Sequence, residues 1–434
     1  NSKEEYLVVK KNNNLLQVPN INSSDAQVKK LIYKVEDNLF NSHYKSSSKP
    51  EYLCVCSGGT TSSCARNGFI TLDLRKEYNE IHLEKEKNLI RIGGGVIMKD
   101  LMNYLEKHNK TFPIGLSKLP GAGYILTGGI SPMSRRYGLA IDNIDSIKGY
   151  LGNGTFISLE KDSLNSTQKL LWKGLKGAAP FLAIITEIGL KTFQSHPIQI
   201  IEGFVDDNEL SKIINLSEGF PENLSLQWIF AERIYVYIFA EIKDDSDKEI
   251  FQNYLKQFEK FSSLKRKIYK TYNHIDFFPK ELDLFELNKN NHSEVISLLG
   301  GDLKNDIQIF VSSLKEIIQN KPNSSCYIAS QQLGLKTKEF DPNSSFFIHR
   351  TSTWKPWIYA AWKKNDLKER EIVLDWMNES WKKLKPFFPQ IHLAQIHNHL
   401  NSHEEEVHLS FGERLHELKT LKNICDPESI LPPL

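Results

Sequence analysis

Residues 115–143, GLSKLPGAGYILTGGISPMSRRYGLAIDN, contain six glycines and two prolines in 29 positions. Glycine lets the backbone approach a ligand without a Cβ in the way, and successive bare amides form an anion-binding concavity. A second glycine-rich segment, SGGTTSS at residues 57–63, follows the apolar run 52–56. We interpret the two segments as opposite sides of one cleft for a phosphate-bearing cofactor.

The composition is that of a globular protein with small-molecule ligands. The chain has 434 residues, 40% of them hydrophobic and 25% charged, which is enough for two domains. A formal net charge of +2 and the lack of a long basic block give no reason to expect nucleic acid. No apolar run reaches 18 residues, so no membrane span is predicted. The expected partner is a small-molecule substrate, and the sequence leaves the oligomeric state open.

Five cysteines are irregularly spaced and form no pattern typical of a metal site. This usage favours a reducing, cytoplasmic compartment. The sequence begins at Asn1 without a methionine, which leaves open a leader that has been removed.

The first half of the chain is predicted to be α+β, with short elements. Helical spacing predicts a helix over 97–108, with Met98, Leu101, Met102 and Leu105 on one face. The sequence Gly152-Asn153-Gly154 between two apolar runs predicts a hairpin with a type I′ turn. The other expected elements are helices at 25–40 and 170–179, and strands at 52–56, 68–74, 88–92, 145–151, 155–159 and 181–192.

After His196-Pro197 the sequence becomes richer in aromatic residues and predicts a second α+β unit. Residues 247–320 look mainly helical, and 367–384 form an amphipathic helix with Ile372, Trp376 and Leu384 facing inward. Residues 410–424 predict a terminal helix that ends at Asp426-Pro427. Strands are expected at 225–231, 233–241, 326–335, 345–351, 357–362 and 392–398. Antiparallel strands interleaved with covering helices indicate a separate domain.

Neither common phosphate-binding loop fits the central segment. Gly121-Ala122-Gly123 resembles the start of a Rossmann fingerprint, and Asp142 lies at a plausible distance for a ribose contact. A Rossmann loop needs a strand just before it and a helix just after it, whereas Leu119-Pro120 precedes and Ser131-Pro132 interrupts. The Walker sequence is also absent.

The ordered set of motifs resembles the vanillyl-alcohol oxidase and p-cresol methylhydroxylase (PCMH) flavoproteins, and within them the berberine-bridge-enzyme-like FAD-linked oxidases. The likeness extends over about residues 45–430. It is carried by SGGTT at 57–61, ITLDL at 70–74, TGG at 127–129, SRRYGLAIDNI at 134–144, LWKGLKG at 171–177, IIT at 184–186, FIHR at 347–350 and the terminal segment 415–427.

This resemblance implies a two-domain α+β fold of the PCMH type. Residues 1–195 would form the FAD-binding domain and 196–404 a substrate-binding domain whose antiparallel sheet is covered by helices. Residues 405–434 would return to the FAD domain. The residues implied to bind FAD are Ser57, Gly58, Gly59, Thr60, Thr61, Gly121, Gly123, Thr127, Gly128, Gly129, Ser134, Tyr137, Gly138, Asn143 and Ile185.

Two departures from the family pattern concern the attachment of the flavin. Many members attach FAD through a histidine in the first glycine loop, where this chain has Thr60. Doubly attached members add a cysteine upstream of the second loop, where we align Leu116. Neither side chain forms such a bond, so non-covalent FAD is expected. A further departure is Ala179-Pro180-Phe181-Leu182, which replaces the family's usual glycine-asparagine-phenylalanine-glycine.

Several side chains are candidates for the reaction site. His349 and Arg350 lie on an expected strand, so they would face opposite sides, and Trp357 lies in an aromatic group that either stacks on substrate or packs the core. The spacing His397-x-His399 would place both imidazoles on one strand face, where either could act as a base. With His403 it resembles a metal pattern, which we interpret as a polar turn, so no metal is predicted. The candidates for the catalytic group are His397, His399, Tyr359 and Gln331, the last only as an orienting group.

The predicted function is FAD-dependent oxidation of a small organic substrate such as an alcohol, a sugar or a secondary metabolite, with a hydride passing to flavin N5. Two alternatives stay open. One is an oxidative cyclase or desaturase of a secondary metabolite on the same fold. The other is a small-molecule-binding protein without catalysis, which is suggested by Thr60, Leu116 and Pro180.

Overall fold

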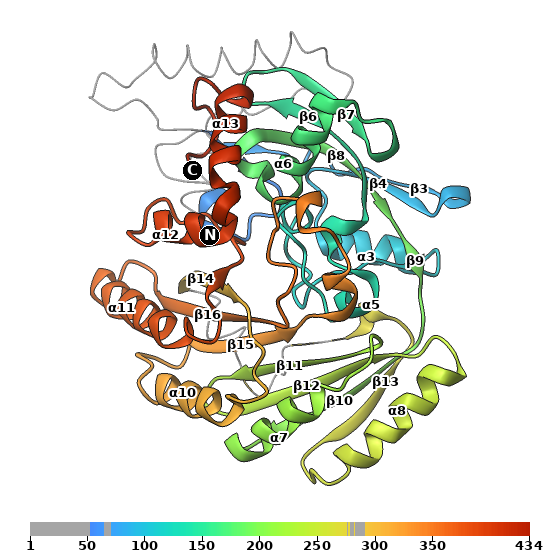
Figure 1. Ribbon diagram of the computed structural model, residues 1–434, viewed down its shortest axis with the longest axis vertical. Helices are drawn as coiled ribbons and strands as arrows, with labels where there is room; N and C mark the ends of the chain where they lie inside the picture. The colour runs from blue at the N-terminus through green and yellow to red at the C-terminus, as the bar shows by residue number, and fades with distance from the viewer. Residues whose placement is uncertain (1–52, 65–70, 276, 278–281, 283–290) are drawn as a thin grey trace.

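The computed structural model describes residues 53–64, 71–275, 277, 282 and 291–434. The helix expected at 25–40 lies outside the described residues. Two antiparallel sheets organise the rest (Figure 1). The five-stranded sheet lies in the upper part of Figure 1 and has the order β3-β4-β8-β6-β7. Its strands are β3 (Ile81–Glu84), β4 (Leu89–Gly93), β8 (Ala183–Lys191), β6 (Ile144–Leu151) and β7 (Phe156–Glu160).

Shorter elements surround this sheet. The first glycine segment follows β1 (Cys54–Cys56), which pairs in parallel with β2 (Thr71–Asp73). Helix α3 (Met98–Glu106) buries Met98, Leu101, Met102 and Leu105, as its periodicity predicts. The remaining elements are α4 (Gly123–Leu126), α5 (Ser134–Tyr137), α6 (Ser166–Leu182), the pair β5 (Lys110–Thr111) and β9 (Phe193–Gln194), and the 3₁₀ turns η1 (Ser62–Cys64), η2 (Lys85–Lys87), η3 (Ala140–Asn143) and η4 (Lys161–Ser163).

The eight-stranded sheet has the order β13-β10-β12-β11-β15-β16-β14-β17. Its strands are β10 (Ile198–Val205), β11 (Leu224–Phe230), β12 (Ile234–Glu241), β13 (Lys265–Tyr269), β14 (Asn291–Leu299), β15 (Tyr327–Gln332), β16 (Trp354–Lys363) and β17 (Gln390–Ile391). All neighbouring strands are antiparallel. The accompanying helices are α7 (Asp207–Ser217), α8 (Asp245–Phe258), α10 (Ile307–Gln319) and α11 (Leu367–Leu384), with 3₁₀ turns η5 (Tyr272–His274), η7 (Leu335–Lys338) and η8 (Pro342–Ser344).

The two faces of this sheet belong to different cores. Trp228, Ile328 and Ile358 pack with the inner faces of α7, α10 and α11, which cover the lower side in Figure 1. Tyr237 and Trp357 point to the other face and join the core of the upper part. Because side chains alternate along a strand, each strand contributes to both cores.

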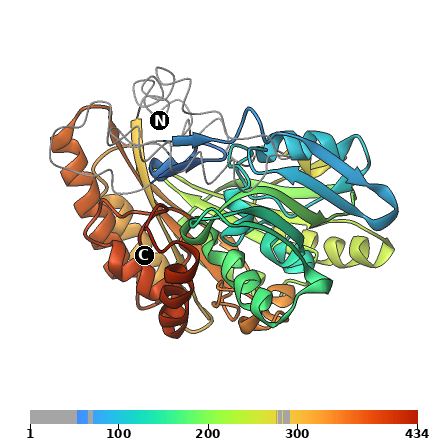
Figure 2. The ribbon, with the colours of Figure 1, turned by 90° about the horizontal axis from the view of Figure 1, so that it is seen from above.

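The end of the chain packs against the first half. After α12 (His403–Phe411) and η9 (Gly412–Arg414), helix α13 (Leu415–Cys425) lies beside α6 in both ribbon views (Figures 1 and 2). A Cβ on Gly174 of α6 would lie 2.4 Å from Leu421 of α13, so the helices meet at a glycine. The Asn153 N–H donates to Cys425 O at 2.7 Å, and the Leu53 N–H donates to Ile430 O at 2.7 Å.

Several element predictions are wrong. Residues 345–351 and 392–398 are not strands, because their backbone bonds are local or irregular: the Ala394 N–H donates to His392 O, and the Phe346 N–H donates to Lys176 O. Residues 247–320, predicted mainly helical, include β13 and β14. Ile372 is 50% exposed, although Trp376 and Leu384 are buried.

The turn between β6 and β7 is a hairpin turn, but not of type I′. Only Gly154 has a positive φ, whereas type I′ needs one at both central residues. The reason is that both central residues of the turn are bonded to distant parts of the chain. Asn153 is bonded to the end of α13, and the Gly152 N–H donates to Leu182 O.

Among the described helices, none combines the length and the apolar character needed to cross a bilayer.

Candidate functional site

The two glycine-rich segments are in direct backbone contact. A Cβ on Gly58 would lie 2.1 Å from Gly121 N, and a Cβ on Gly121 would lie 2.4 Å from Gly58 N. Ser57 holds the first segment in place, since its Oγ donates a hydrogen bond to Gly94 O at 2.6 Å. Only glycine fits at either contact, and the predicted meeting of the two segments is therefore present in the structure.

The exposed side of this contact suits a diphosphate. Among the described residues, no acceptor is bonded to the backbone N–H of Gly58, Thr60 or Thr61. Gly59 has a φ of +74°, which turns the peptide groups on either side of it. A Cβ added to Gly123 would meet no atom within 4 Å, so open space adjoins the second segment. Bare amides next to open space are the donor set that an FAD diphosphate needs.

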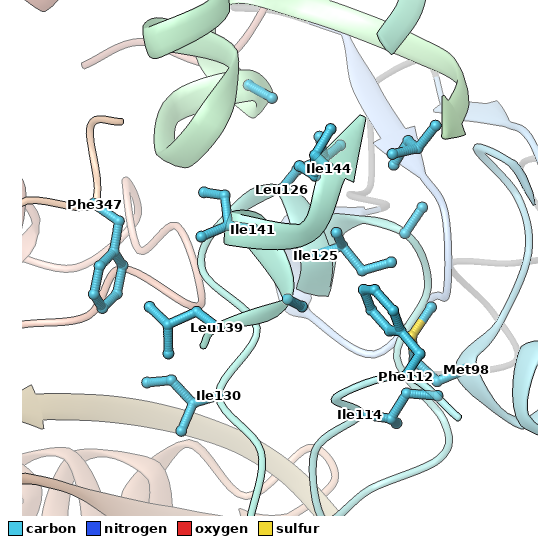
Figure 3. Close-up of a cluster of buried hydrophobic side chains, with 14 of the residues drawn as sticks. Met98, Phe112, Ile114, Ile125, Leu126, Ile130, Leu139, Ile141, Ile144 and Phe347 are labelled. Carbon is cyan, nitrogen blue, oxygen red and sulfur yellow. The ribbon is translucent and has the colours of Figure 1, made fainter. Parts of the chain in front are cut away.

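The rest of the second segment is held by its own side chains. Gly128 and Gly129 have φ values of +144° and +73°. Asn143 Nδ2 donates to Tyr137 O and Leu139 O, both at 3.0 Å. Ser134 is fully buried, and its Oγ accepts the Ser131 N–H. Figure 3 shows Ile130, Leu139 and Ile141 of this segment in a cluster of buried hydrophobic side chains, with Phe347 contributed by a different part of the chain.

Arg135 and Arg136 are engaged in protein contacts. Buried Arg135 donates to the carbonyl oxygens of Phe220, Leu224 and Leu333, and burial lowers its pKa to about 10. Arg136 forms an ion pair with Asp247 at 2.7 Å and with Glu241 at 3.1 Å.

The hydroxyl of Tyr137, a predicted FAD contact, donates to Glu241 at 2.7 Å, and its ring packs on Phe193. Tyr137 and its two arginine neighbours therefore fasten the second glycine segment to the eight-stranded sheet.

Arg350 and His349, the predicted substrate ligands, are also occupied. Arg350 Nη1 donates to Asp142 Oδ2 at 2.8 Å, and the Arg350 side chain is 1% exposed. Asp142 additionally accepts the Leu139 N–H, so it caps η3 as well as pairing with Arg350. His349 Nε2 lies 2.8 Å from Leu409 O, where it donates, and burial lowers the pKa of His349.

A row of polar residues crosses the face of the eight-stranded sheet that points away from α7, α10 and α11. We call this the inner face of the sheet. Tyr237 lies opposite Gln227, Gln227 opposite Gln331, and Gln331 opposite Lys355. The Tyr237 hydroxyl, Gln227 Oε1 and Gln331 Nε2 are buried, and none has a hydrogen-bond partner in the described protein. Buried polar atoms are normally paired, so unpaired atoms in one row indicate a ligand-binding surface.

Aromatic side chains flank this row on the same face. Trp357 follows Lys355 two residues along β16, and Lys355 Nζ lies 4.4 Å from its ring centroid. Tyr359 stacks on Tyr327 with ring centroids 4.6 Å apart and an interplanar angle of 12°. Burial raises the pKa of Tyr359, which keeps its hydroxyl protonated at neutral pH. The structure thus brings Tyr359, Gln331 and Trp357, three predicted site residues, to one face.

Lys355 and His392 complete the surface and connect it to the second glycine segment. Burial lowers the pKa of Lys355 to about 7. Burial and the nearby Lys355 lower the pKa of His392 to about 3, so this imidazole is neutral. His392 Nε2 donates to Thr127 O at 3.0 Å and lies against Gly128. The lone pair of buried Nδ1 has no partner among the described residues.

His397 and His399 do not reach this face. His397 Nδ1 bonds to Glu406 Oε2 at 2.8 Å, and His399 Nε2 bonds to Glu294 Oε1 at 2.7 Å. Glu294 lies opposite Ala360, on the helix-covered face of the sheet. The prediction that both histidines share a strand face is wrong, because residues 392–399 form turns. The described residues contain no group of three side chains suited to a metal ion.

A separate hollow lies elsewhere on the described surface. It has a volume of about 830 Å³ and is lined by residues of β10, α7 and α10. Its charged groups are already satisfied: Lys315 pairs with Asp207 at 2.7 Å, and Arg233 lies 3.5 Å from the Phe204 ring centroid. We do not assign it a ligand.

Sequence reasoning missed Lys355, His392, Gln227 and Tyr237. A lysine before Pro356 gives no signal of burial, and His392 stands in a segment that was mistaken for a strand. The alternation of polar and aromatic residues in Lys355, Trp357 and Tyr359 was the available signal, since all three share one face of β16.

Comparisons with known proteins agree with this geometry. Residues 46–160 match a family model described as an FAD binding domain. The (R)-6-hydroxynicotine oxidase of Paenarthrobacter nicotinovorans is 28% identical over 197 residues, which cover 44% of this chain and 41% of the relative. The FAD-linked oxidoreductase nodO of Hypoxylon pulicicidum is 32% identical over 150 residues, covering 34% of this chain and 32% of nodO. The matched stretches are thus less than half the length of either relative.

Solved structures extend the likeness over the whole fold. The Physcomitrella patens BBE-like 1 protein superposes with a TM-score of 0.76 at 17% identity, covering 99% of this chain and 94% of its own. A chitooligosaccharide oxidase superposes with a TM-score of 0.73 at 15% identity, covering 94% of this chain and 88% of its own. The predicted α+β fold of the PCMH type is confirmed. The chain contains an FAD binding domain and has the fold of the berberine-bridge-enzyme-like flavoproteins.

Proposed function

We propose that the protein is an FAD-dependent oxidoreductase that oxidises a small organic substrate against the inner face of the eight-stranded sheet. The proposal rests on the row Tyr237, Gln227 and Gln331, whose buried polar atoms have no partner among the described residues, and on Lys355, which continues the row. His392 links this row to Thr127 and Gly128 of the second glycine segment. A substrate on the row would therefore lie beside the segment that we assign to the cofactor.

The FAD would be held mainly by backbone groups. Residues 57–61 would bind the diphosphate through the amides of Gly58, Thr60 and Thr61, and the open space at Gly123 would admit the cofactor. When bound, FAD supplies a hydride acceptor at N5. The side chains of this chain bind and orient the substrate, and the aromatic wall of Trp357, Tyr327 and Tyr359 excludes water from it.

The proton released by the substrate needs an acceptor on this face. Protonated Tyr359 can donate a hydrogen bond but is a poor acceptor, and the Gln331 amide can only orient. Lys355, with a pKa near 7, is the cationic group of this face, and we assign it to substrate binding and not to proton transfer. His397 and His399 are bound to carboxylates on the other face.

We also propose that the flavin is not covalently attached. Thr60 and Leu116 lack a nucleophilic atom suited to the bond, and the nearby Cys64 is buried against Cys56. The test is a visible spectrum of the purified protein, followed by acid precipitation. We expect oxidised-flavin absorbance that moves to the supernatant. Flavin that stays in the pellet would disprove the non-covalent link, and protein that binds no added FAD would disprove the oxidoreductase.

Bleaching of the flavin absorbance by candidate substrates without oxygen tests the reaction itself. Mass analysis of the product separates plain oxidation from oxidative cyclisation. The (R)-6-hydroxynicotine oxidase match makes cyclic amines a sensible part of that panel, beside alcohols and sugars.

A further inference from the structure

We propose that Lys355 binds the carboxylate of a planar, acidic substrate, while Gln331, Gln227 and Tyr237 bind its other polar groups. The inference rests on the proposed function, because it places the substrate on the same face of the sheet. It goes further by naming the substrate's chemical class and the residue that selects it.

Lys355 is a partly buried amine without a counter-ion among the described residues. No carboxylate in the described residues forms an ion pair or hydrogen bond with Lys355, whose neighbours are the Trp357 ring and the neutral His392. The acidic residue in the row is Glu202, opposite Tyr237 on β10, and it pairs with Lys267. Four strand spacings separate Glu202 from Lys355, or roughly 19 Å. Partial desolvation of an amine without a counter-ion is unfavourable, so the anion is expected to come from a ligand.

The row does not suit a phosphate group. A phosphate mainly accepts hydrogen bonds, but Gln227 Oε1 and His392 Nδ1 present lone pairs and no proton. Gln331 Nε2 and the Tyr237 hydroxyl can donate. A surface that mixes donors and acceptors fits an organic acid that also carries hydroxyl, amine or carbonyl groups. For that reason we assign Lys355 to the substrate and not to the FAD diphosphate.

The shape of this face suits a flat ligand. Trp357 and the stacked pair Tyr327 and Tyr359 lie beside the polar row on the same face, and aromatic side chains favour flat ligands. From Lys355 to Tyr237 the row crosses three strand spacings, or roughly 14 Å. This length suits a conjugated acid of one or two rings with a polar group at the far end.

Proton uptake gives a test that does not depend on turnover. The titratable group that interacts electrostatically with Lys355 is His392, which stays neutral above its pKa of about 3. At pH 8 an amine with a pKa near 7 is about 10% charged. A carboxylate that binds to the ammonium form therefore draws in about 0.9 proton per ligand, whereas a neutral ligand draws in none.

The experiment is isothermal titration of the FAD-loaded protein at pH 8 with 2-naphthoate and with its neutral isostere 2-naphthamide. Each titration is made in two buffers of different ionisation enthalpy. We expect the acid to bind at least tenfold more tightly than the amide, with uptake of close to one proton. The Lys355→Met variant should show neither the preference for the acid over the amide nor the proton uptake. Lys355→Arg should keep the preference without the uptake, because arginine is already charged.

Lys363→Met is the matched control, since Lys363 is an exposed lysine at the end of the same strand. It should leave both quantities unchanged, and thermal melts would verify that each variant folds. Equal binding of acid and amide, no measurable naphthoate binding at millimolar concentration, or an unaltered preference in Lys355→Met would overturn the proposal. Loss of bound FAD in Lys355→Met with the acid preference retained would also overturn it, since the lysine would then serve the cofactor. A protein that prefers the acid but shows no flavin reduction would refute the oxidoreductase alone.

Discussion

Arg350 and Asp142 form a buried ion pair between residues 208 positions apart in the sequence, with Arg350 Nη1 2.8 Å from Asp142 Oδ2. Asp142 ends the second glycine segment, and Arg350 precedes the strand that carries Lys355. Arg350 also donates to Phe347 O and Ser345 Oγ. This pair sets the position of the second glycine segment relative to the segment that leads into β16.

Arg350→Met should lower the free energy of unfolding by about 3–5 kcal/mol, because it leaves the Asp142 carboxylate buried without its partner. The double variant Arg350→Met with Asp142→Leu should recover part of this loss, since no lone charge remains. Urea denaturation measures both. Lys382→Ala, which breaks an exposed pair with Glu379, is the control and should change stability by less than about 0.5 kcal/mol. If Arg350→Met lowers the free energy of unfolding no more than Lys382→Ala does, the Arg350–Asp142 pair does not have this role.

Gly123→Ala should weaken FAD binding at least tenfold without loss of stability. The added methyl group meets no protein atom within 4 Å, so the folded protein tolerates it, but it enters the space that we assign to FAD. Gly58→Ala should instead damage the fold itself, since its Cβ would lie 2.1 Å from Gly121 N. Flavin fluorescence titration and thermal melts distinguish the two effects. Normal FAD affinity in Gly123→Ala would place the cofactor elsewhere.

Gln331→Leu and Gln332→Leu should differ sharply, although the residues are adjacent. Gln332 faces the opposite side, where its Oε1 accepts the Leu226 N–H and its Nε2 donates to Ser217 O. Gln332→Leu leaves the Leu226 N–H and Ser217 O unpaired and buried, and should lower the free energy of unfolding by about 2–5 kcal/mol.

Gln331 Nε2 has no partner among the described residues, so Gln331→Leu should be nearly neutral for stability and should weaken binding of a 2-naphthoate that carries a second polar group such as a hydroxyl. Calorimetry of both variants checks this pair. A large stability loss in Gln331→Leu would mean that the side chain is structural.

The buried cluster of His397 with Glu294 and Glu406 should make stability depend on pH. Burial opposes the charged form, but the two carboxylates raise the pKa of His397 to about 9, above its unfolded value near 6.5. Its contribution is fully present below pH 6.5 and is lost as the pH rises through 9. Burial likewise opposes ionisation of Glu294, yet the two histidines lower its pKa to about 2, so that its contribution is lost only as the pH falls through 2.

We therefore expect this cluster to stabilise the fold most between about pH 4.5 and 6.5. His397→Gln should flatten the decline between pH 6.5 and 9, which is on the order of 3 kcal/mol in the wild type. Urea melts at half-unit pH steps measure the difference between the two proteins. Parallel curves for wild type and variant would rule out the predicted linkage.

The order of motifs along the sequence was enough to predict the fold and the meeting of the glycine segments. The contact between Gly58 and Gly121 follows from chemistry that a sequence displays, because glycine at a close backbone approach has few substitutes. Helix α3 could also be predicted from the sequence, since its four apolar positions recur at helical spacing.

The functional side chains were harder to predict, because their roles depend on contacts between distant segments. Tyr137 belongs to a cofactor motif, yet its hydroxyl is bonded to Glu241 from another sheet. His397 and His399 looked like free bases, but Glu294 and Glu406 approach from β14 and α12. Lys355 became a candidate only when the strand register placed it in line with Gln331, Gln227 and Tyr237.

The bonds of Leu53 to Ile430 and of Asn153 to Cys425 have a consequence for biosynthesis. The strand that leads into the first glycine segment is held by residues made almost four hundred positions later. A nascent chain emerging from the ribosome cannot complete the cofactor half until Ile430 has appeared. Flavin capture should therefore be a late event, and a translation stall before residue 425 should release a product that does not retain FAD.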